Sequence, residues 1–166
     1  IGSQHAKHAS NLGTLVAVCD IKKDRAKSIA EHYQCKAYFS LDELLTDEKN
    51  LDLIAICTPN GLHAEHSIKA LKTGCNVLCE KPMATTVRDC ERMIHTAEET
   101  NRRLFIVKQN RFNPPVKAVK RIIDEGKLGK ILSVQVNCFW NRNREYYLGS
   151  DWRGKLAMDG GTLFTQ

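Results

Sequence analysis

The chain has 166 residues, of which 42% are hydrophobic and 27% are charged, and its formal net charge is +6. This length suffices for one well-filled domain, or for one domain and the beginning of a second. The near-average composition excludes fibrous proteins and argues against disorder. No apolar run approaches the roughly 20 residues that cross a bilayer, and the N-terminus lacks the layout of a signal peptide. We therefore expect a globular, cytoplasmic protein that does not bind membranes.

The seven cysteines and the positive charge both have plain interpretations. No cysteines form a C-x-x-C pair and several fall in apolar, strand-like runs, which favours buried thiols in a reducing compartment over disulfides or zinc. The basic residues are spread through amphipathic helical segments, and no motif that reads nucleic acids is present. We expect neither a metal ion nor nucleic acid as a partner, and small anionic ligands fit the charge better.

Short apolar strands alternate with helical patterns through the first two thirds of the chain. Ser40, with Glu43 three residues later, is a start signal for a helix, and Thr73-Gly74 ends another. Repeated β-α-β order with nearly continuous apolar strands predicts an α/β fold, in which helices cover both faces of a doubly wound, Rossmann-type parallel sheet. In chain order the sequence predicts a helix at 3–9, a strand at 15–19, a helix at 23–33, a strand at 36–39, a helix from 41, a strand at 51–57, a helix at 62–72, a strand at 76–79, a helix at 87–100 and a strand at 104–107.

The pattern changes after Asn110. Pro114-Pro115 opens a helix that runs to about residue 125, Gly126 stops it, and residues 131–140 alternate like a strand with one exposed face. We expect a nucleotide-binding domain over 1–110 and the start of an α+β domain with a mostly antiparallel sheet over 111–166. A doubly wound domain opens with a strand that leads into a glycine-rich turn, so we also expect sequence before residue 1 and after residue 166.

Two residues in the first β-α-β unit indicate a dinucleotide site. Gly2, followed by a helical pattern, fits the last glycine of G-x-G-x-x-G, where the backbone approaches a pyrophosphate; a plain loop glycine is the alternative. Asp20 closes the next strand at about the spacing of the acid that hydrogen-bonds the ribose hydroxyls. A carboxylate there favours NAD over NADP, and its alternative role is to cap the next helix.

Polar residues also follow two later strands, at the sheet edge where open α/β folds bind ligands. Thr58-Pro59-Asn60 is one such loop, and His63 behind it is either a cofactor contact or a structural histidine. Glu80-Lys81-Pro82 follows the strand at 76–79. Lys81 is the best candidate for proton transfer in alcohol oxidation, provided that burial and a nearby cation lower its pKa from about 10.4. An ordinary surface pair of Glu80 and Lys81 is the alternative.

The segment Gly74–Ala84, GCNVLCEKPMA, together with the 57–60 loop and His63, resembles the hallmark segments of the glucose-fructose oxidoreductase / inositol dehydrogenase family. The resemblance extends over essentially the whole chain. It implies an NAD-dependent dehydrogenase that acts on a CH–OH group of a sugar and assembles as a homodimer or homotetramer. With Gly2 and Asp20 included, the expected cofactor contacts are Gly2, Asp20, Thr58, Pro59, Asn60, His63, Glu80, Lys81, Gln109 and Asn110.

A narrower resemblance covers the second half of the chain. Segments 107–111, 137–140, 145–147, 152–154 and 159–161 are similar to the branch that oxidises the 3-hydroxyl of UDP-N-acetylglucosaminuronic acid in bacterial surface-polysaccharide synthesis. Arginines suit the carboxylate or phosphates of such a ligand, and aromatic rings suit its sugar or base. The candidate substrate residues are Lys81, Arg111, Tyr146, Tyr147, Trp152 and Arg153, and sheet-core packing is the alternative for the aromatic ones.

The chain departs from the family pattern after the double glycine. The family has Asp or Asn there and, one helical turn later, a His that assists proton handling, whereas this chain has Thr165 and ends at Gln166. Thr165, the second catalytic candidate, can hydrogen-bond a sugar hydroxyl but cannot act as a carboxylate, so proton handling rests more on Lys81. The alternatives are an inositol or polyol dehydrogenase and an NAD-binding regulator that lost catalysis; full activity is not expected of this chain alone.

Overall fold

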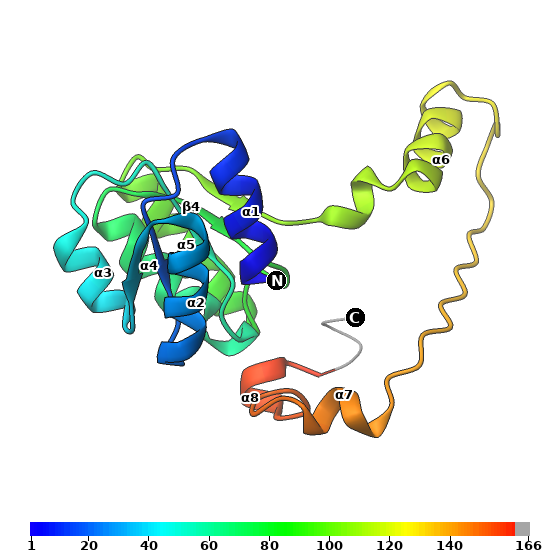
Figure 1. Cartoon of the computed structure of the whole chain (residues 1–166). Coiled ribbons are helices and arrows are strands. Elements are labelled where there is room, and N and C mark those ends of the chain that lie inside the picture. The colour runs from blue at the N-terminus through cyan, green and yellow to red at the C-terminus, as the bar shows by residue number, and fades with distance from the viewer. Residues whose placement is uncertain (162–166) are drawn as a thin grey trace.

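In the computed structural model, which describes residues 1–161, an α/β body forms from residues 1–106 (Figure 1). Each strand and helix predicted for this region is present, with bounds shifted by a few residues, which confirms the α/β class. The strands are β1 (Ala17–Cys19), β2 (Lys36–Tyr38), β3 (Leu53–Ile56), β4 (Asn76–Cys79) and β5 (Leu104–Ile106). The helices are α1 (Gly2–Leu12), α2 (Lys23–Tyr33), α3 (Leu41–Asp47), α4 (His63–Lys72) and α5 (Val87–Glu99), with the short 3-10 turn η1 (Asn60–Leu62) before α4.

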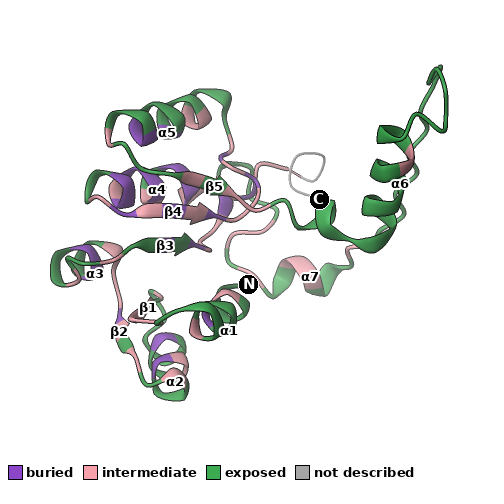
Figure 2. Cartoon of the chain, turned by 90° about the horizontal axis from the view of Figure 1, so that it is seen from above, coloured by how far each residue is buried: buried purple, intermediate pink, exposed green. Residues whose placement is uncertain are grey.

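All of these strands pair in parallel, but they form two separate sheets. β1 pairs with β2, and β3, β4 and β5 pair in that order, with Leu53 opposite Asn76 at the start of the three-stranded sheet. Within residues 1–161 no strand joins β1 to β3, and Figure 2 shows the two sheets as separate groups. The predicted parallel direction is confirmed, and one continuous sheet is not formed by the described residues. The expected additional strand stays a prediction.

Short-range signals explain several of the helix ends. Ser40 caps α3, because its side-chain oxygen accepts a hydrogen bond from Glu43 N at 3.1 Å, as the sequence predicts. Thr86 caps α5 in the same way, accepting from Asp89 N at 3.1 Å. Gly74 follows α4 with φ of +89°, a conformation that residues with a side chain rarely adopt. Each of these signals lies within four residues of the helix end that it determines.

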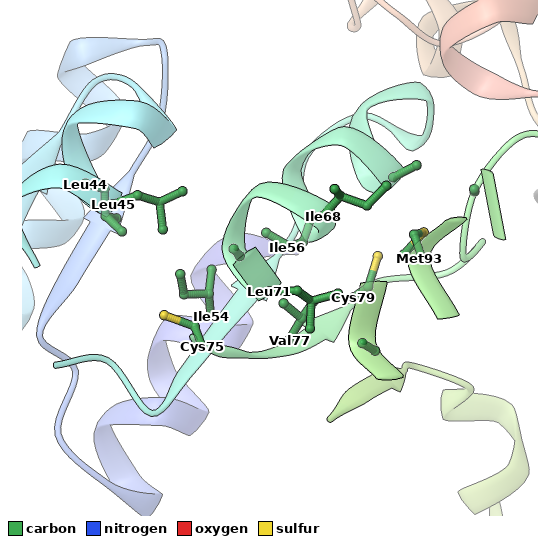
Figure 3. Close-up of a cluster of buried hydrophobic side chains, with 14 of the residues drawn as sticks. Leu44, Leu45, Ile54, Ile56, Ile68, Leu71, Cys75, Val77, Cys79 and Met93 are labelled. Carbon is green, nitrogen blue, oxygen red and sulfur yellow. The ribbon is translucent and has the colours of Figure 1, made fainter. Parts of the chain in front are cut away.

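Most of the hydrophobic core lies between the three-stranded sheet and helices α4 and α5, and it also includes Tyr38 on β2 and Leu44 and Leu45 on α3 (Figure 3). Leu71 on α4, Val77 and Cys79 on β4, and Met93 on α5 have no exposed surface. Figure 2 shows buried residues on these elements and also on α1, α2 and α3. This packing gives the loops that follow β3 and β4 a rigid support.

Replacing Leu71 with alanine is expected to lower the free energy of unfolding by about 2–5 kcal/mol, because the cavity lies where the surroundings cannot collapse. Urea unfolding followed by circular dichroism measures the change. The control is Leu12→Ala at the end of α1, where the side chain is 88% exposed, and its effect is expected to stay within about 0.5 kcal/mol. Equal losses in the two variants would contradict this location of the core.

After β5 the chain first leaves the α/β body and later returns to it through α8 (Leu156–Asp159). This second half holds η2 (Gln109–Phe112), α6 (Pro114–Asp124), α7 (Arg144–Leu148) and α8. Figure 1 shows α6 apart from the body, followed by a long extended segment that leads back to α7 and α8. The predicted helix after Pro114 is confirmed. No helix within residues 1–161 combines the length and the apolar character required to cross a membrane.

The strand predicted over residues 131–140 is wrong for the described structure. These residues are extended but belong to no ladder, and Leu132 and Phe139 are 85% and 96% exposed. A strand requires a neighbour for its backbone hydrogen bonds, and residues 1–161 supply none there. Consequently, the described part of the chain contains no antiparallel strand pairing.

Candidate active site

A buried histidine ties together the loops that follow β3 and β4. The ring of His63, at the start of α4, is 1% exposed. Its Nδ1 lies 2.7 Å from the carbonyl oxygen of Pro82, and its Nε2 lies 2.8 Å from that of Thr58. The loops at 57–60 and 80–82 therefore meet at one edge of the sheet, as the sequence predicts for strand carboxyl ends.

The same contacts favour a structural role for His63. Both of its ring nitrogens face backbone carbonyls inside the protein, so neither is directed at a ligand. The neighbouring His66 approaches the side chain of Thr58, with Nδ1 3.1 Å from Oγ1. Burial is the main cause that lowers the pKa of His66, and it favours the neutral imidazole. The two histidines thus stabilise the loop after β3.

Glu80 and Lys81 do not form an isolated surface pair. The carboxylate of Glu80 lies 2.8 Å from His5 Nε2 on α1, and its other oxygen accepts a hydrogen bond from Lys81 N at 3.1 Å. The side chain of Glu80 is only 13% exposed, and Lys81 is partly buried. Both residues therefore belong to an ordered edge, which weakens the alternative of two solvated charges.

The thiols at this edge remain protonated at neutral pH. Burial, with a smaller contribution from the Glu80 carboxylate, raises the pKa of Cys57 to about 12 and that of Cys79 to about 11. A protonated thiol is neither a strong nucleophile nor a metal ligand. The expectation of buried thiols is wrong for Cys19 and Cys138, which are exposed.

The N-terminal end of α1 lies beside the end of β3. A Cβ added to Gly2 would be 3.8 Å from the Cβ of Cys57. The first turn of α1 carries no acidic residue and no side chain that caps its N–H groups. The positive end of this helix therefore suits an anionic group such as a pyrophosphate.

Asp20 closes β1 and organises the turn into α2. Its Oδ1 accepts a hydrogen bond from Lys22 N at 2.8 Å. Because each carboxylate oxygen can accept more than one hydrogen bond, this turn contact is compatible with ribose binding. The side chain of Lys22 also reaches Asp151 at 3.1 Å, in an exposed pair that links the turn to the second half of the chain.

Arginine and aromatic side chains stack on one another in the second half. The guanidinium carbon of Arg153 lies 4.4 Å from the ring centre of Tyr146 and 5.5 Å from that of Trp152. Tyr147 meets Tyr146 edge to face at 5.2 Å. The Nε of Arg153 is buried without a hydrogen-bond partner among the described residues. We call this group the aromatic–arginine cluster: Trp140, Arg142, Tyr146, Tyr147, Trp152 and Arg153.

The structure brings together only some of the predicted substrate residues. Tyr146, Tyr147, Trp152 and Arg153 share the cluster, whereas Arg111 is exposed in η2. Gln109 and Asn110 are likewise exposed in η2, directly after β5. The second catalytic candidate, Thr165, lies outside the described residues.

A buried contact fastens the segment around α8 to the loop after β3. Asn60 is 8% exposed, and its Nδ2 donates to the carbonyl oxygen of Asp159 at 2.8 Å. The carboxylate of Asp159 in turn accepts from Gly154 N at 3.0 Å. Asn60 was predicted as a cofactor contact, and here its amide holds the segment that carries Arg153. No role was predicted for Asp159 beyond its place in segment 159–161, although its position before a double glycine was a usable signal.

Gly61 allows this close approach, and valine in its place is expected to displace α8. An added Cβ would lie 2.4 Å from Ala157 O and 3.0 Å from Met158 Cα, which is backbone that cannot move aside locally. We expect trypsin to cleave after Arg153 and Lys155 several-fold faster in Gly61→Val. The control is Gly13→Val, because a Cβ there meets nothing closer than 3.9 Å. Unchanged cleavage in Gly61→Val would contradict the described contact.

Comparison with known proteins identifies the family. Residues 1–108 match the model of an oxidoreductase family with an NAD-binding Rossmann fold, GFO_IDH_MocA. The chain belongs to this family. The match confirms the resemblance inferred from the sequence and gives NAD as the cofactor, in agreement with the uncapped start of α1 and the carboxylate at the end of β1.

Solved and curated relatives show which activities occur on this fold. The chain resembles the WlbA dehydrogenase of Bordetella pertussis, solved with NADH and UDP-GlcNAcA, with 36% identity and a TM-score of 0.91 over 97% of this chain and 51% of that one. The WlbA dehydrogenase of Chromobacterium violaceum, also solved with both ligands, is 35% identical to the chain. Its TM-score is 0.91, and the match covers 98% of this chain and 47% of that one. The inositol 2-dehydrogenase of Salmonella typhimurium is 33% identical over 140 residues, which cover 81% of this chain and 41% of the relative. The chain thus spans about half the length of these relatives or less.

Proposed function

We propose that this chain forms the cofactor-binding part, and the beginning of the substrate-binding part, of an NAD-dependent dehydrogenase for a nucleotide sugar. The observation that carries the proposal is the ordered Glu80-Lys81 pair at the carboxyl end of β4, beside the loop after β3 and the start of α1. The proposed reaction is oxidation of the C3 hydroxyl of UDP-N-acetylglucosaminuronate. The likeness to WlbA supports this choice of substrate.

In the proposed mechanism, Lys81 moves the proton. Its amine accepts the hydroxyl proton of the substrate during oxidation and returns a proton to the carbonyl in the reverse direction. When bound, NAD supplies the nicotinamide carbon that takes up the hydride. Glu80 holds the backbone of Lys81 through the bond to its N–H, which fixes the place from which the side chain extends. Thr165 is proposed to hydrogen-bond a sugar hydroxyl.

At this edge of the sheet, some residues are proposed to bind the cofactor and others the substrate. The N–H groups at the start of α1 suit the pyrophosphate, and Asp20 suits the ribose hydroxyls. The loop 58–60 and residues 109–110 are proposed to contact the remainder of the cofactor. Arg153 suits a carboxylate or phosphate of the substrate, since its Nε is buried without a partner among residues 1–161. Arg111 is proposed as a second anion-binding arginine.

The wider setting follows from the same proposal. We propose a domain boundary near residue 110, with a substrate-binding and oligomerisation domain beyond it, and the family match over residues 1–108 supports this boundary. Because the proposed substrate is a UDP-linked uronate, we propose that the enzyme acts in the synthesis of a surface polysaccharide in the cytoplasm. The family resemblance supports a homodimer or homotetramer.

A substrate panel tests the proposal in the full-length protein that contains this chain. Purified protein is mixed with excess NAD and, in separate reactions, UDP-N-acetylglucosaminuronate, UDP-N-acetylglucosamine and myo-inositol, and NADH absorbance is followed during a single turnover. Single-turnover mixing detects hydride transfer even if a tightly bound cofactor is recycled. Reduction is expected with the uronate and not with the two compounds that lack its carboxylate.

Other results of the panel favour the other candidates. Reduction with myo-inositol alone would overturn the proposed substrate in favour of an inositol dehydrogenase, a candidate that the 33% identity to the Salmonella typhimurium enzyme supports. Tight NAD binding without reduction by any sugar would instead favour a non-catalytic regulator.

A further inference from the structure

His5 has no role in the motifs of the sequence or in the proposed reaction, yet it makes a long-range contact at the candidate site. It lies in the first turns of α1, and its ring is 20% exposed. Its Nε2 lies 2.8 Å from Oε1 of Glu80, a residue 75 positions away in the sequence. This contact joins the helix that suits the pyrophosphate to the residue directly before Lys81.

The carboxylate of Glu80 is held on both sides. Oε1 faces His5, and Oε2 accepts a hydrogen bond from Lys81 N at 3.1 Å. The backbone of Glu80 is fixed as well, because its N–H donates to Ile56 O at 2.9 Å, one residue beyond the paired part of β4. At 13% exposure, a carboxylate that loses one of these partners is left poorly solvated. The contact with His5 therefore restricts the orientation of the group that holds Lys81.

A second histidine–glutamate contact in the chain shows what a surface pair looks like. His95 and Glu99 on α5 are 3.5 Å apart and are 72% and 59% exposed. Pairs of this kind contribute little to stability, because water screens them and the side chains stay mobile. The His5–Glu80 contact differs in distance, in burial and in joining two separate elements. His95 thus provides a matched control.

We propose that His5 is a positioning residue for proton transfer. Through Glu80 it fixes the position of the Lys81 backbone relative to α1. The helix start that suits the cofactor's pyrophosphate and the residue that moves the proton are thereby held at a constant distance. This inference rests on the proposed function. It assigns His5 no direct contact with the substrate or with the nicotinamide.

Kinetics in the full-length protein test the positioning role. His5→Leu keeps much of the volume of the side chain and removes the nitrogen, and it is expected to lower kcat by about 10- to 100-fold, the cost of a small displacement of a reacting group. The dissociation constant of NAD is expected to change by less than about threefold, since the helix start itself is intact. His5→Gln, whose amide can donate to Glu80, should recover most of the loss, and His95→Leu should match wild type.

Several results would overturn the inference. They are an unchanged kcat in His5→Leu, a loss of activity in His5→Leu that comes only from weaker NAD binding or a higher KM, and a kcat in His5→Gln as low as that in His5→Leu. If His5→Leu does not fold by circular dichroism, His5→Ala is measured in its place, because alanine favours the helix.

A readout without substrate separates this inference from the proposed function. The amide of Lys81 donates to Glu80, so its hydrogen exchange reports whether the carboxylate is held. We expect exchange at Lys81 to be at least about tenfold faster in His5→Leu than in wild type or His95→Leu. Equal exchange rates overturn the role of His5, whereas a wild type that oxidises no sugar overturns the proposed function alone.

Discussion

Replacing Lys81 with alanine is expected to lower the rate constant for hydride transfer by about 10²- to 10⁴-fold, the usual contribution of a general acid or base. The residue follows β4 at the edge where the loops at 57–60 and 80–82 are tied together by His63. Lys81→Arg is expected to be nearly as slow, because a guanidinium keeps its proton at all working pH values. Stopped-flow absorbance of NADH, with saturating cofactor and UDP-N-acetylglucosaminuronate, measures the rate in the full-length protein.

The control for this substitution is Lys72→Ala at the exposed end of α4, which should retain the wild-type rate. NAD binding by Lys81→Ala, measured by calorimetry, should be changed only a few-fold. A Lys81→Ala protein with the wild-type rate would exclude Lys81 from proton transfer and would leave Glu80-Lys81 as a structural pair.

Replacing Asp20 with asparagine is expected to raise the preference for NADP relative to NAD by about tenfold or more, equivalent to ~1.4 kcal/mol. The carboxylate disfavours the 2′-phosphate of NADP by charge repulsion, and Asn removes that charge. The amide oxygen of Asn can still accept from Lys22 N, so the turn that Asp20 stabilises at 2.8 Å should be kept. Dissociation constants for the two cofactors, measured by fluorescence titration, give the ratio.

Asp24→Asn is the matched control, because Asp24 is exposed in the first helical turn of α2, four residues after Asp20. This substitution removes the same negative charge, but from a residue that does not lie at the end of β1. An unchanged ratio in Asp20→Asn, or an equal change in Asp24→Asn, would leave Asp20 with only its structural role in the turn.

The parts of the fold that the sequence predicted are those governed by short-range signals. Ser40 and Glu43 lie within one helical turn of each other, and the apolar run at 51–57 is long enough to reveal a strand without knowledge of its neighbours. Placing Lys81 beside the 57–60 loop required one further rule, that the carboxyl ends of parallel strands share an edge. Those inferences required no knowledge of the rest of the chain.

Features that depend on distant partners were not accessible in the same way. Residues 131–140 have the alternation of a strand, but alternation does not provide the second strand that pairing requires. The contacts of Glu80 with His5 and of Asn60 with Asp159 span 75 and 99 positions. No local pattern records such pairs. For the same reason the sequence left the role of His63 open, whereas two carbonyl contacts favour a structural one.

The most direct test of a hydride-transferring dehydrogenase follows the hydride itself. The full-length protein is mixed with NAD and UDP-N-acetylglucosaminuronate carrying deuterium at C3, and the NADH formed in one turnover is analysed by mass spectrometry. The expected NADH is one mass unit heavier than the product from unlabelled sugar, with the label on the nicotinamide ring. NADH without the label, or no NADH from protein that binds both ligands, would contradict the proposed hydride transfer.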